Sequence, residues 1–182
     1  TKKIKDFKDY LSFLKSNKII IDQKEREEII LNKISSYSRS KEYREKLNPK
    51  LLEEVVNIVE YPNLLHVSFS KDYLEIPKEI VISTLEKHQR YFPIFDSRDR
   101  LTNYFFVVAN KKDVNKFIFQ GNKRVVEARL ADAKFFWDKD RSKNLIKQIA
   151  NLKSVTFYEK LGTIFEKTQR LRQLAGLLSD DL

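Results

Sequence analysis

The spacing of apolar residues predicts two helices and a short strand in the first part of the chain. A first amphipathic helix is indicated by apolar positions three and four residues apart, Phe7, Leu11 and Leu14. The β-branched run 19–21 favours a short strand. Asp22 then caps a second helix, with Glu25 placed as in a capping box, and its buried face carries Ile30, Ile34 and Tyr37. The polar stretch 35–40 predicts a bend or loop.

Helical and strand-like patterns follow one another in the middle of the chain. Asn48-Pro49 predicts a helix start, and one apolar face follows it, Leu51, Leu52, Val55, Val56 and Val59. The stretch 64–70 alternates as a strand, and Pro77 begins a helix whose inward face is Val81, Leu85 and His88. Two runs rich in aromatic and β-branched residues, 90–95 and 101–109, flank a polar loop and predict an antiparallel hairpin.

Beyond residue 110 the pattern predicts helices throughout. A helix beginning with Asn122 as its N-cap, directly after Gly121, has an apolar face formed by Val126, Leu130, Ala133 and Trp137. A last helix carries the stripe Ile164, Thr168, Leu171, Ala175 and Leu178.

These elements predict an α+β fold with a central, mostly antiparallel sheet packed with helices, and with helical N- and C-terminal segments. The 182 residues are enough for one large domain or a compact domain with helical extensions. We expect an N-terminal helical and short-strand segment over 1–48, an α+β core over 49–140 and C-terminal helices over 141–182. The aromatic residues of the hairpin read as core rather than as a base-stacking platform, namely Phe92, Phe95, Tyr104, Phe105 and Phe106.

The charge balance favours a polyanionic partner. Thirty-six Lys and Arg stand against 26 Asp and Glu, a formal net charge of +10. Because lysines and acidic residues are interleaved along the whole chain, this balance is also that of a solvated lysine-rich surface. The more specific signal is a set of cations beside the apolar face of the 121–137 helix, which are candidate contacts for nucleic-acid phosphates: Lys123, Arg124, Arg129 and Lys134.

These four cations also have a purely structural interpretation. Lys123 with Glu127, and Lys134 with Asp138, are spaced four residues apart, as in surface ion pairs along a helix. Arg129 has Asp132 within one turn.

Several classes of chemistry find no support in the sequence. There is no cysteine, and the three glycines are isolated, so thiolate metal sites and glycine-rich phosphate loops are excluded. The two histidines stand apart, and we assign no metal site and no catalytic residue. His66 is interpreted as a satisfied or edge-exposed structural histidine, and His88 as a helix C-terminal cap. No apolar run approaches the roughly 20 residues of a membrane span, so we expect a soluble, cytoplasmic protein without membrane contact.

Several blocks together resemble the β subunit of the bacterial two-subunit glycyl-tRNA synthetase, and they occur in the order of that family. They are Val59-Glu60-Tyr61-Pro62, Ser68-Phe69 with Leu74 to Pro77, His88 to Pro93, Phe106 to Asn110, Gly121 to Val126, Arg129 to Ala133 with Phe135-Phe136, and Leu161 to Thr163 with Lys167, Thr168 and Arg170. Two departures are visible, because family members often have Glu in place of Lys123 and often a glycine within the loop 97–99.

The resemblance implies a fragment of a longer β subunit from a tetramer of two α and two β subunits. In that enzyme the α subunit makes glycyl-adenylate from glycine and ATP with magnesium, and the β subunit is needed for tRNA recognition. No cofactor is then expected in this fragment itself. The expected partners are the α subunit, glycine tRNA and the remaining β domains, and residues 141–182 would lead toward a helical HD-type domain.

Three roles for the segment follow from these patterns. The leading hypothesis is a scaffold and tRNA-facing part of the ligase, with the four cations of the 121–137 helix as the contact candidates. The second is a subunit-interaction module that does not touch RNA, suggested by the long apolar stripe of the last helix. The third is an editing-type hydrolase, suggested only by fold kinship with the phenylalanyl enzyme.

Overall fold

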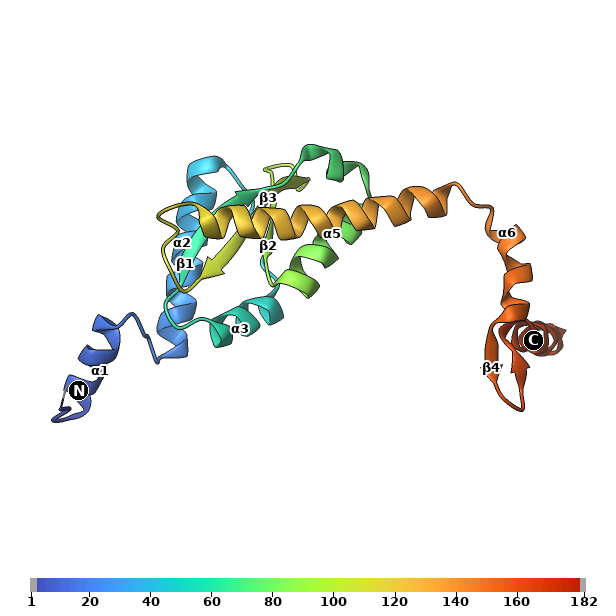
Figure 1. Cartoon of the computed structure of the whole chain (residues 1–182), viewed down its shortest axis with the longest axis horizontal. Coiled ribbons are helices and arrows are strands. Elements are labelled where there is room, and N and C mark those ends of the chain that lie inside the picture. Colours follow the sequence, from blue (N-terminus) through green and yellow to red (C-terminus); the bar gives the residue numbers. More distant parts are fainter. Residues whose placement is uncertain (1–2, 181–182) are drawn as a thin grey trace. The chain divides into compact units, whose positions relative to one another are not determined.

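The computed structural model describes residues 3–180, whose helices and small antiparallel sheets form an α+β fold (Figure 1). The main sheet has the order β1-β3-β2, with β1 spanning Asn63–Ser68, β2 Phe92–Phe95 and β3 Leu101–Ala109. The chain divides into two compact units, with the boundary between Lys134 and Phe135. We call them the first unit and the second unit. The predicted fold class and the central hairpin are confirmed.

Both neighbours of β3 are antiparallel to it, and the pairing sets the two faces of the sheet. His66 and Phe92 each lie opposite Phe106, whereas Val67 lies opposite Phe105. Because successive side chains of a strand point to opposite faces, Phe105 and Phe106 serve two different cores.

One core lies between the sheet and two N-terminal helices, α2 (Gln23–Lys41) and α3 (Pro49–Ile58). Its buried members include the apolar faces that the sequence predicts for both helices, joined by Phe92, Ile94 and Phe106. The helix starts are also confirmed, since Asp22 accepts hydrogen bonds from Lys24 N and Glu25 N, and Asn48 accepts from Lys50 N and Leu51 N. Each fully buried apolar side chain contributes about 1.5–3 kcal/mol to stability.

The N-terminal segment differs from the expected pattern in two places. Helix α1 (Phe7–Ser16) forms as predicted, but residues 19–21 form no strand. The guanidinium of the buried Arg26 donates hydrogen bonds to the carbonyls of Ile20 and Ile21, at 2.6 Å each. These carbonyls are therefore not available as acceptors for a neighbouring strand. The predicted bend at 35–40 is also wrong, because α2 continues to Lys41 with Ser38 buried on its inner face.

A second core covers the other face of the sheet, where Val67 and Phe105 are fully buried. The short 3-10 helix η1 (Lys71–Glu75) and helix α4 (Lys78–Ser83) lie between β1 and β2 in the chain. A π-helical turn, η2, follows directly over Thr84–His88. Val81 and Leu85 are buried as predicted, but His88 is exposed. A π-helical turn contains more residues than an α-helical turn, which moves His88 off the inward face.

Helix α5 (Phe117–Arg141) passes over the sheet in Figure 1, and its hydrogen bonds confirm this placement. It begins earlier than the sequence predicts, because the Asp113 carboxylate accepts from Ile118 N at 3.0 Å and Phe119 N at 2.6 Å. Asn122 is therefore a residue within the helix and not its N-cap. Its side chain donates to the Ile118 carbonyl at 2.6 Å and accepts from the Tyr91 hydroxyl.

The second unit contains α6 (Leu145–Gln148), the 3-10 helix η3 (Ile149–Ser154), a small hairpin and α7 (Ile164–Asp180). The hairpin pairs β4 (Thr156–Tyr158) with β5 (Gly162–Thr163). Its presence makes the expectation of helices throughout this region wrong. Both strands are very short and β4 is exposed, so neither produces a buried alternating pattern.

No helix within residues 3–180 combines the length and the apolar character that crossing a membrane requires.

Candidate nucleic-acid interface

Helix α5 is anchored by a buried seam. Val126 and Leu130 are both 0% exposed, and the Glu127 carboxylate accepts a hydrogen bond from Ser70 N at 3.1 Å. Burial raises the pKa of Tyr91, so its hydroxyl stays neutral and donates to Asn122. The outer face of α5 is thereby held in a fixed orientation over the first unit.

Two of the four predicted cations are engaged in ion pairs. Lys123 Nζ lies 3.9 Å from Glu127, which is the structural pairing that the spacing predicts. Lys134 Nζ lies 2.9 Å from the carboxylate of Glu75, which η1 contributes from 59 residues away. Both lysines are partly buried, and their charge is partly neutralised by these carboxylates.

The other two cations are available. Arg124 and Arg129 are exposed, and neither side chain makes an ion pair or hydrogen bond with any residue that the structure describes. The alternative pairing of Arg129 with Asp132 is therefore not formed. The structure separates the four candidates into two structural lysines and two free arginines.

A shallow hollow of about 500 Å³ adjoins this surface. Its lining brings Tyr73 of η1 next to the polar residues of α5, among them Gln120, Lys123 and Arg124. An aromatic ring beside Arg and Lys side chains provides both stacking and phosphate contacts, the two interactions that RNA-binding surfaces use most.

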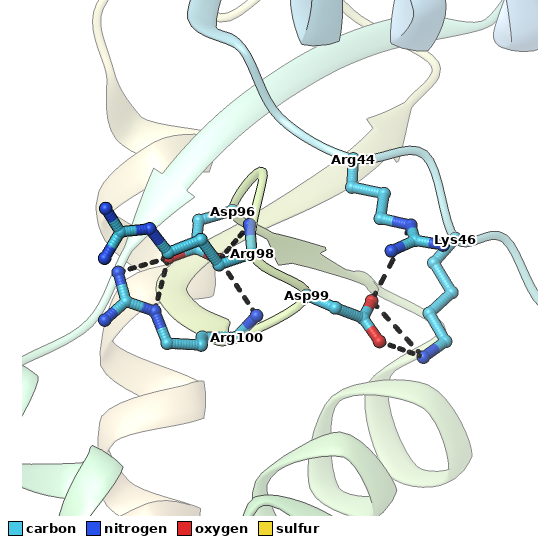
Figure 2. Close-up of polar contacts among 6 residues, drawn as sticks. All are labelled: Arg44, Lys46, Asp96, Arg98, Asp99 and Arg100. Atoms are coloured by element: carbon cyan, nitrogen blue, oxygen red, sulfur yellow. Dashed lines mark hydrogen bonds and ion pairs between the residues drawn. The ribbon is translucent and has the colours of Figure 1, made fainter.

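A second group of cations surrounds the loop between β2 and β3 (Figure 2). Asp96 accepts from Arg98 N at 3.0 Å and Arg100 N at 2.9 Å, and its carboxylate lies 2.7 Å from the Arg100 guanidinium. These hydrogen bonds, those from the Arg100 backbone first, hold the pKa of Asp96 below its usual range. The loop is closed around this carboxylate.

Asp99 holds the opposite side of the same loop. Lys46 Nζ lies 3.2 Å from Asp99 and Arg44 Nε lies 3.9 Å from it, and Arg44 N donates to the Phe95 carbonyl at 2.9 Å. Asp99 has a φ of 60°, a conformation that glycine adopts most readily.

This second group is one that sequence reasoning missed. The loop itself was identified as polar, but Arg44 and Lys46 lie about fifty residues upstream in the chain. They reach the loop only because the segment after α2 makes an isolated bridge between Arg44 and Phe95.

His66 lies in an aromatic stack instead of a polar site. Its ring stacks on Tyr37 and Tyr104, with centroids 4.7 Å and 4.6 Å away. Its Nε2 atom is buried and has no hydrogen-bond partner among the described residues, so the predicted satisfied histidine is not observed. The residue does lie on an edge strand, β1, where it is half-buried. Burial first, and then the charge of Lys41, lowers the pKa of His66.

No cluster of three or more His, Asp or Glu side chains with the arrangement of a metal site occurs within residues 3–180. The exposed cations of the described surface have the chemistry to contact anions.

The sequence matches, over residues 1–182, a family model described as glycyl-tRNA synthetase beta subunit. It is 37% identical to the glycine–tRNA ligase beta subunit of Listeria welshimeri, covering 100% of this chain and 27% of that protein. The corresponding beta subunit of Clostridioides difficile is 38% identical, over 100% of this chain and 26% of the relative. The beta subunit of Trichlorobacter lovleyi is 37% identical, over 98% of this chain and 26% of the relative. The chain thus spans about a quarter of the length of these relatives.

Proposed function

The chain belongs to the glycyl-tRNA synthetase beta-subunit family, and from that premise we propose that it is a scaffold that contacts tRNA through the outer face of α5. The observation that carries the proposal is the pair of unpartnered arginines, Arg124 and Arg129, on a helix anchored by the buried Val126 and Leu130, while Ala133 and Trp137 of the predicted apolar face are half-buried. A fixed helix presents its cations without having to order them first, which lowers the entropic cost of binding.

The chemistry of these two side chains suits RNA. A guanidinium donates two parallel hydrogen bonds to a phosphate, and it is more weakly hydrated than an ammonium group. The formal net charge of +10 adds a long-range attraction for a polyanion. Tyr73 in the adjoining hollow offers a ring on which an unpaired base could stack.

We further propose that this segment serves a cytoplasmic enzyme of two α and two β subunits that attaches glycine to its tRNA. The α subunit would hold ATP and magnesium and form the glycyl-adenylate. The present chain would hold the tRNA together with the remaining β domains. No catalytic residue, metal or cofactor is assigned to it.

The test is a titration of transcribed glycine tRNA with the chain, followed by fluorescence anisotropy over a range of salt concentrations. Replacing both Arg124 and Arg129 with Ala should weaken binding and reduce the slope of log K against log salt by about 1.4–1.8, that is, 0.7–0.9 for each lost phosphate contact. Both side chains are exposed, so the unfolding free energy should change by less than about 0.5 kcal/mol.

A matched control removes two exposed cations elsewhere in the first unit, Lys24 and Lys50, which lie on α2 and α3. This variant has the same net charge as the arginine variant. If the two variants bind tRNA equally well, the contribution is that of overall charge, and the proposed contact surface on α5 is wrong.

A second candidate function is that of a subunit-interaction module that makes no contact with RNA. The observation in its favour is the apolar face of α7, where the exposed fractions lie between 54% and 65% for Leu171, Leu174, Leu177 and Leu178. Soluble proteins seldom leave several leucines of one helix exposed without a partner.

Binding of the isolated α subunit of the enzyme, measured by pull-down, separates the two functions. The double substitution Leu171→Asp and Leu178→Asp should abolish capture if α7 is the docking face. Capture that survives the substitution would count against the interaction module.

A further inference from the structure

We propose that the β2–β3 loop, together with Arg44 and Lys46, forms a second phosphate-binding surface for RNA. The proposal rests on the proposed function, in that the chain must contact tRNA at all. It concerns a different surface from the outer face of α5, built by different elements, and we call it the hairpin-loop surface.

The loop is preorganised by its own backbone. Asp96 N donates to the Arg100 carbonyl at 2.9 Å, and Asp99 N donates to the Asp96 carbonyl at 3.0 Å. The Asp96 carboxylate accepts hydrogen bonds from two further backbone donors of the turn, Arg98 N and Arg100 N. The backbone of such a loop does not have to be ordered when a ligand arrives, so only the cationic side chains lose freedom on binding.

Cations outnumber carboxylates on this surface. Four cations, Arg44, Lys46, Arg98 and Arg100, surround two carboxylates, and both carboxylates are already engaged. The side chains of Arg44, Lys46 and Arg100 are 60%, 58% and 68% exposed, so an incoming anion can reach them.

Arg98 is the most available of these cations. It is exposed, and its guanidinium makes no ion pair or hydrogen bond with the residues that the structure describes. Figure 2 shows the Arg98 and Arg100 side chains extending to the same side of the loop, away from Arg44 and Lys46. Because Arg100 uses only part of its five-donor group on Asp96, the two side chains together offer donors to one phosphate.

A hollow of about 270 Å³ beside the loop favours a nucleotide over a simple anion. It is lined by the charged side chains Lys78, Asp99 and Arg100 and by the apolar side chains Leu74, Ile76 and Leu101, and Lys46 already pairs with the Asp99 carboxylate. The cations would meet a phosphate while the apolar wall meets the adjoining sugar or base. An acidic protein surface would offer carboxylates to the cations but no planar base to the apolar wall. RNA offers both a phosphate and a base, so it is the ligand that fits better.

The experiment is a salt-dependent titration of transcribed glycine tRNA with the 182-residue chain and three variants. Arg98→Ala should weaken binding and lower the slope of log K against log salt by about 0.7–0.9. Arg98→Lys keeps the charge and should recover most of the slope. Ser97→Ala, a change at the neighbouring loop position, should bind as the unmodified chain does. Thermal unfolding checks that all three fold alike.

The outcomes separate this proposal from the proposed function. Unchanged binding by Arg98→Ala, in a chain whose Arg124 and Arg129 variant is weakened, overturns the hairpin-loop surface alone. Failure of the unmodified chain to bind tRNA overturns both. Equal weakening by Arg98→Ala and Ser97→Ala would show a loss of loop structure and would also overturn the phosphate contact.

Discussion

Helices α5 and α7 carry the same kind of apolar stripe, but only the stripe of α5 is covered within the described chain. Val126 and Leu130 are 0% exposed, whereas Leu171 and Leu178 are 54% and 65% exposed. Both sequences repeat apolar residues at helical spacing. The difference shows that periodicity identifies a helix and its apolar face, while it leaves open what covers that face.

The covering of α5 has specific causes. Polar contacts from Asn122, Glu127 and Lys134 tie the helix to Tyr91, which precedes β2, and to Ser70 and Glu75 at the two ends of η1. In α7, the half-buried positions end at Thr168, after the first turns that contact the small hairpin and η3. Every described residue from 169 onward is exposed as far as residue 179.

The largest expected effect comes from truncating one leucine in each helix. Leu130→Ala should reduce the unfolding free energy by about 2–5 kcal/mol, because it leaves a cavity in a closed core. Leu174→Ala should change it by less than about 0.5 kcal/mol, since this side chain is already exposed. Urea unfolding followed by circular dichroism measures both. Equal losses would mean that the stripe of α7 is covered as well.

A smaller effect should follow from removing one hydroxyl in each unit. Tyr91→Phe deprives Asn122 of a partly buried hydrogen bond and should cost about 1–3 kcal/mol. Tyr158→Phe in the second unit removes a hydroxyl from a side chain that is 64% exposed, and we expect no measurable change. A large loss from the second substitution would show that the two units are stabilised in the same way.

Two glycines give a comparison of similar size but opposite sign. Gly121→Ala lies inside α5 with nothing within 4 Å of the added Cβ, and it should stabilise the helix by about 0.5–1 kcal/mol. Gly162→Ala should destabilise the small hairpin by about 1–2 kcal/mol, because its φ is 76°. Thermal unfolding curves test both signs, and a stabilising Gly162→Ala would contradict the geometry of β5.

The smallest expected effect concerns the pH dependence of stability and the ring of His66. Burial lowers the pKa of His66 from its ordinary value of 6.5, so the unfolded chain binds the proton more tightly than the folded chain. The contribution of the neutral His66 ring to the unfolding free energy should therefore be fully present above pH 6.5, and it should decline as the pH falls below 6.5. His66→Phe should flatten this decline below pH 6.5. An unchanged profile in His66→Phe would contradict the assignment.

Much of the first unit could be predicted from the sequence, because its signals are local. Asp22 and Asn48 cap helices with side chains adjacent in sequence, and the two long runs of the hairpin are buried on both faces. The failures arose where a distant or unusual partner replaced a local one. Arg26 donates hydrogen bonds to carbonyls of the segment 19–21, so no strand forms there. Asp113 accepts a hydrogen bond from Ile118 N, so α5 begins before Asn122.

The candidate surfaces were predictable to a smaller degree. Spacing placed the four cations of α5 off its apolar face, but only the fold showed that Glu75 engages Lys134 while Arg129 stays free. The hairpin-loop surface could not be found from spacing at all. It depends on an isolated β-bridge between Arg44 and Phe95, and no local pattern in the sequence predicts that contact.

The π-helical turn Thr84–His88 contains one residue more than the α-helical turn that could occupy the same place. Deleting Lys87 would let the turn shorten to ordinary α-helical bonding, so the loss could be absorbed there before Tyr91 reaches its core position. Deleting Glu127 would instead rotate Leu130 away from the sheet. We expect the first deletion to lower the unfolding free energy less than the second. By this criterion, gaps and insertions among related sequences should gather at the turn and avoid the middle of α5.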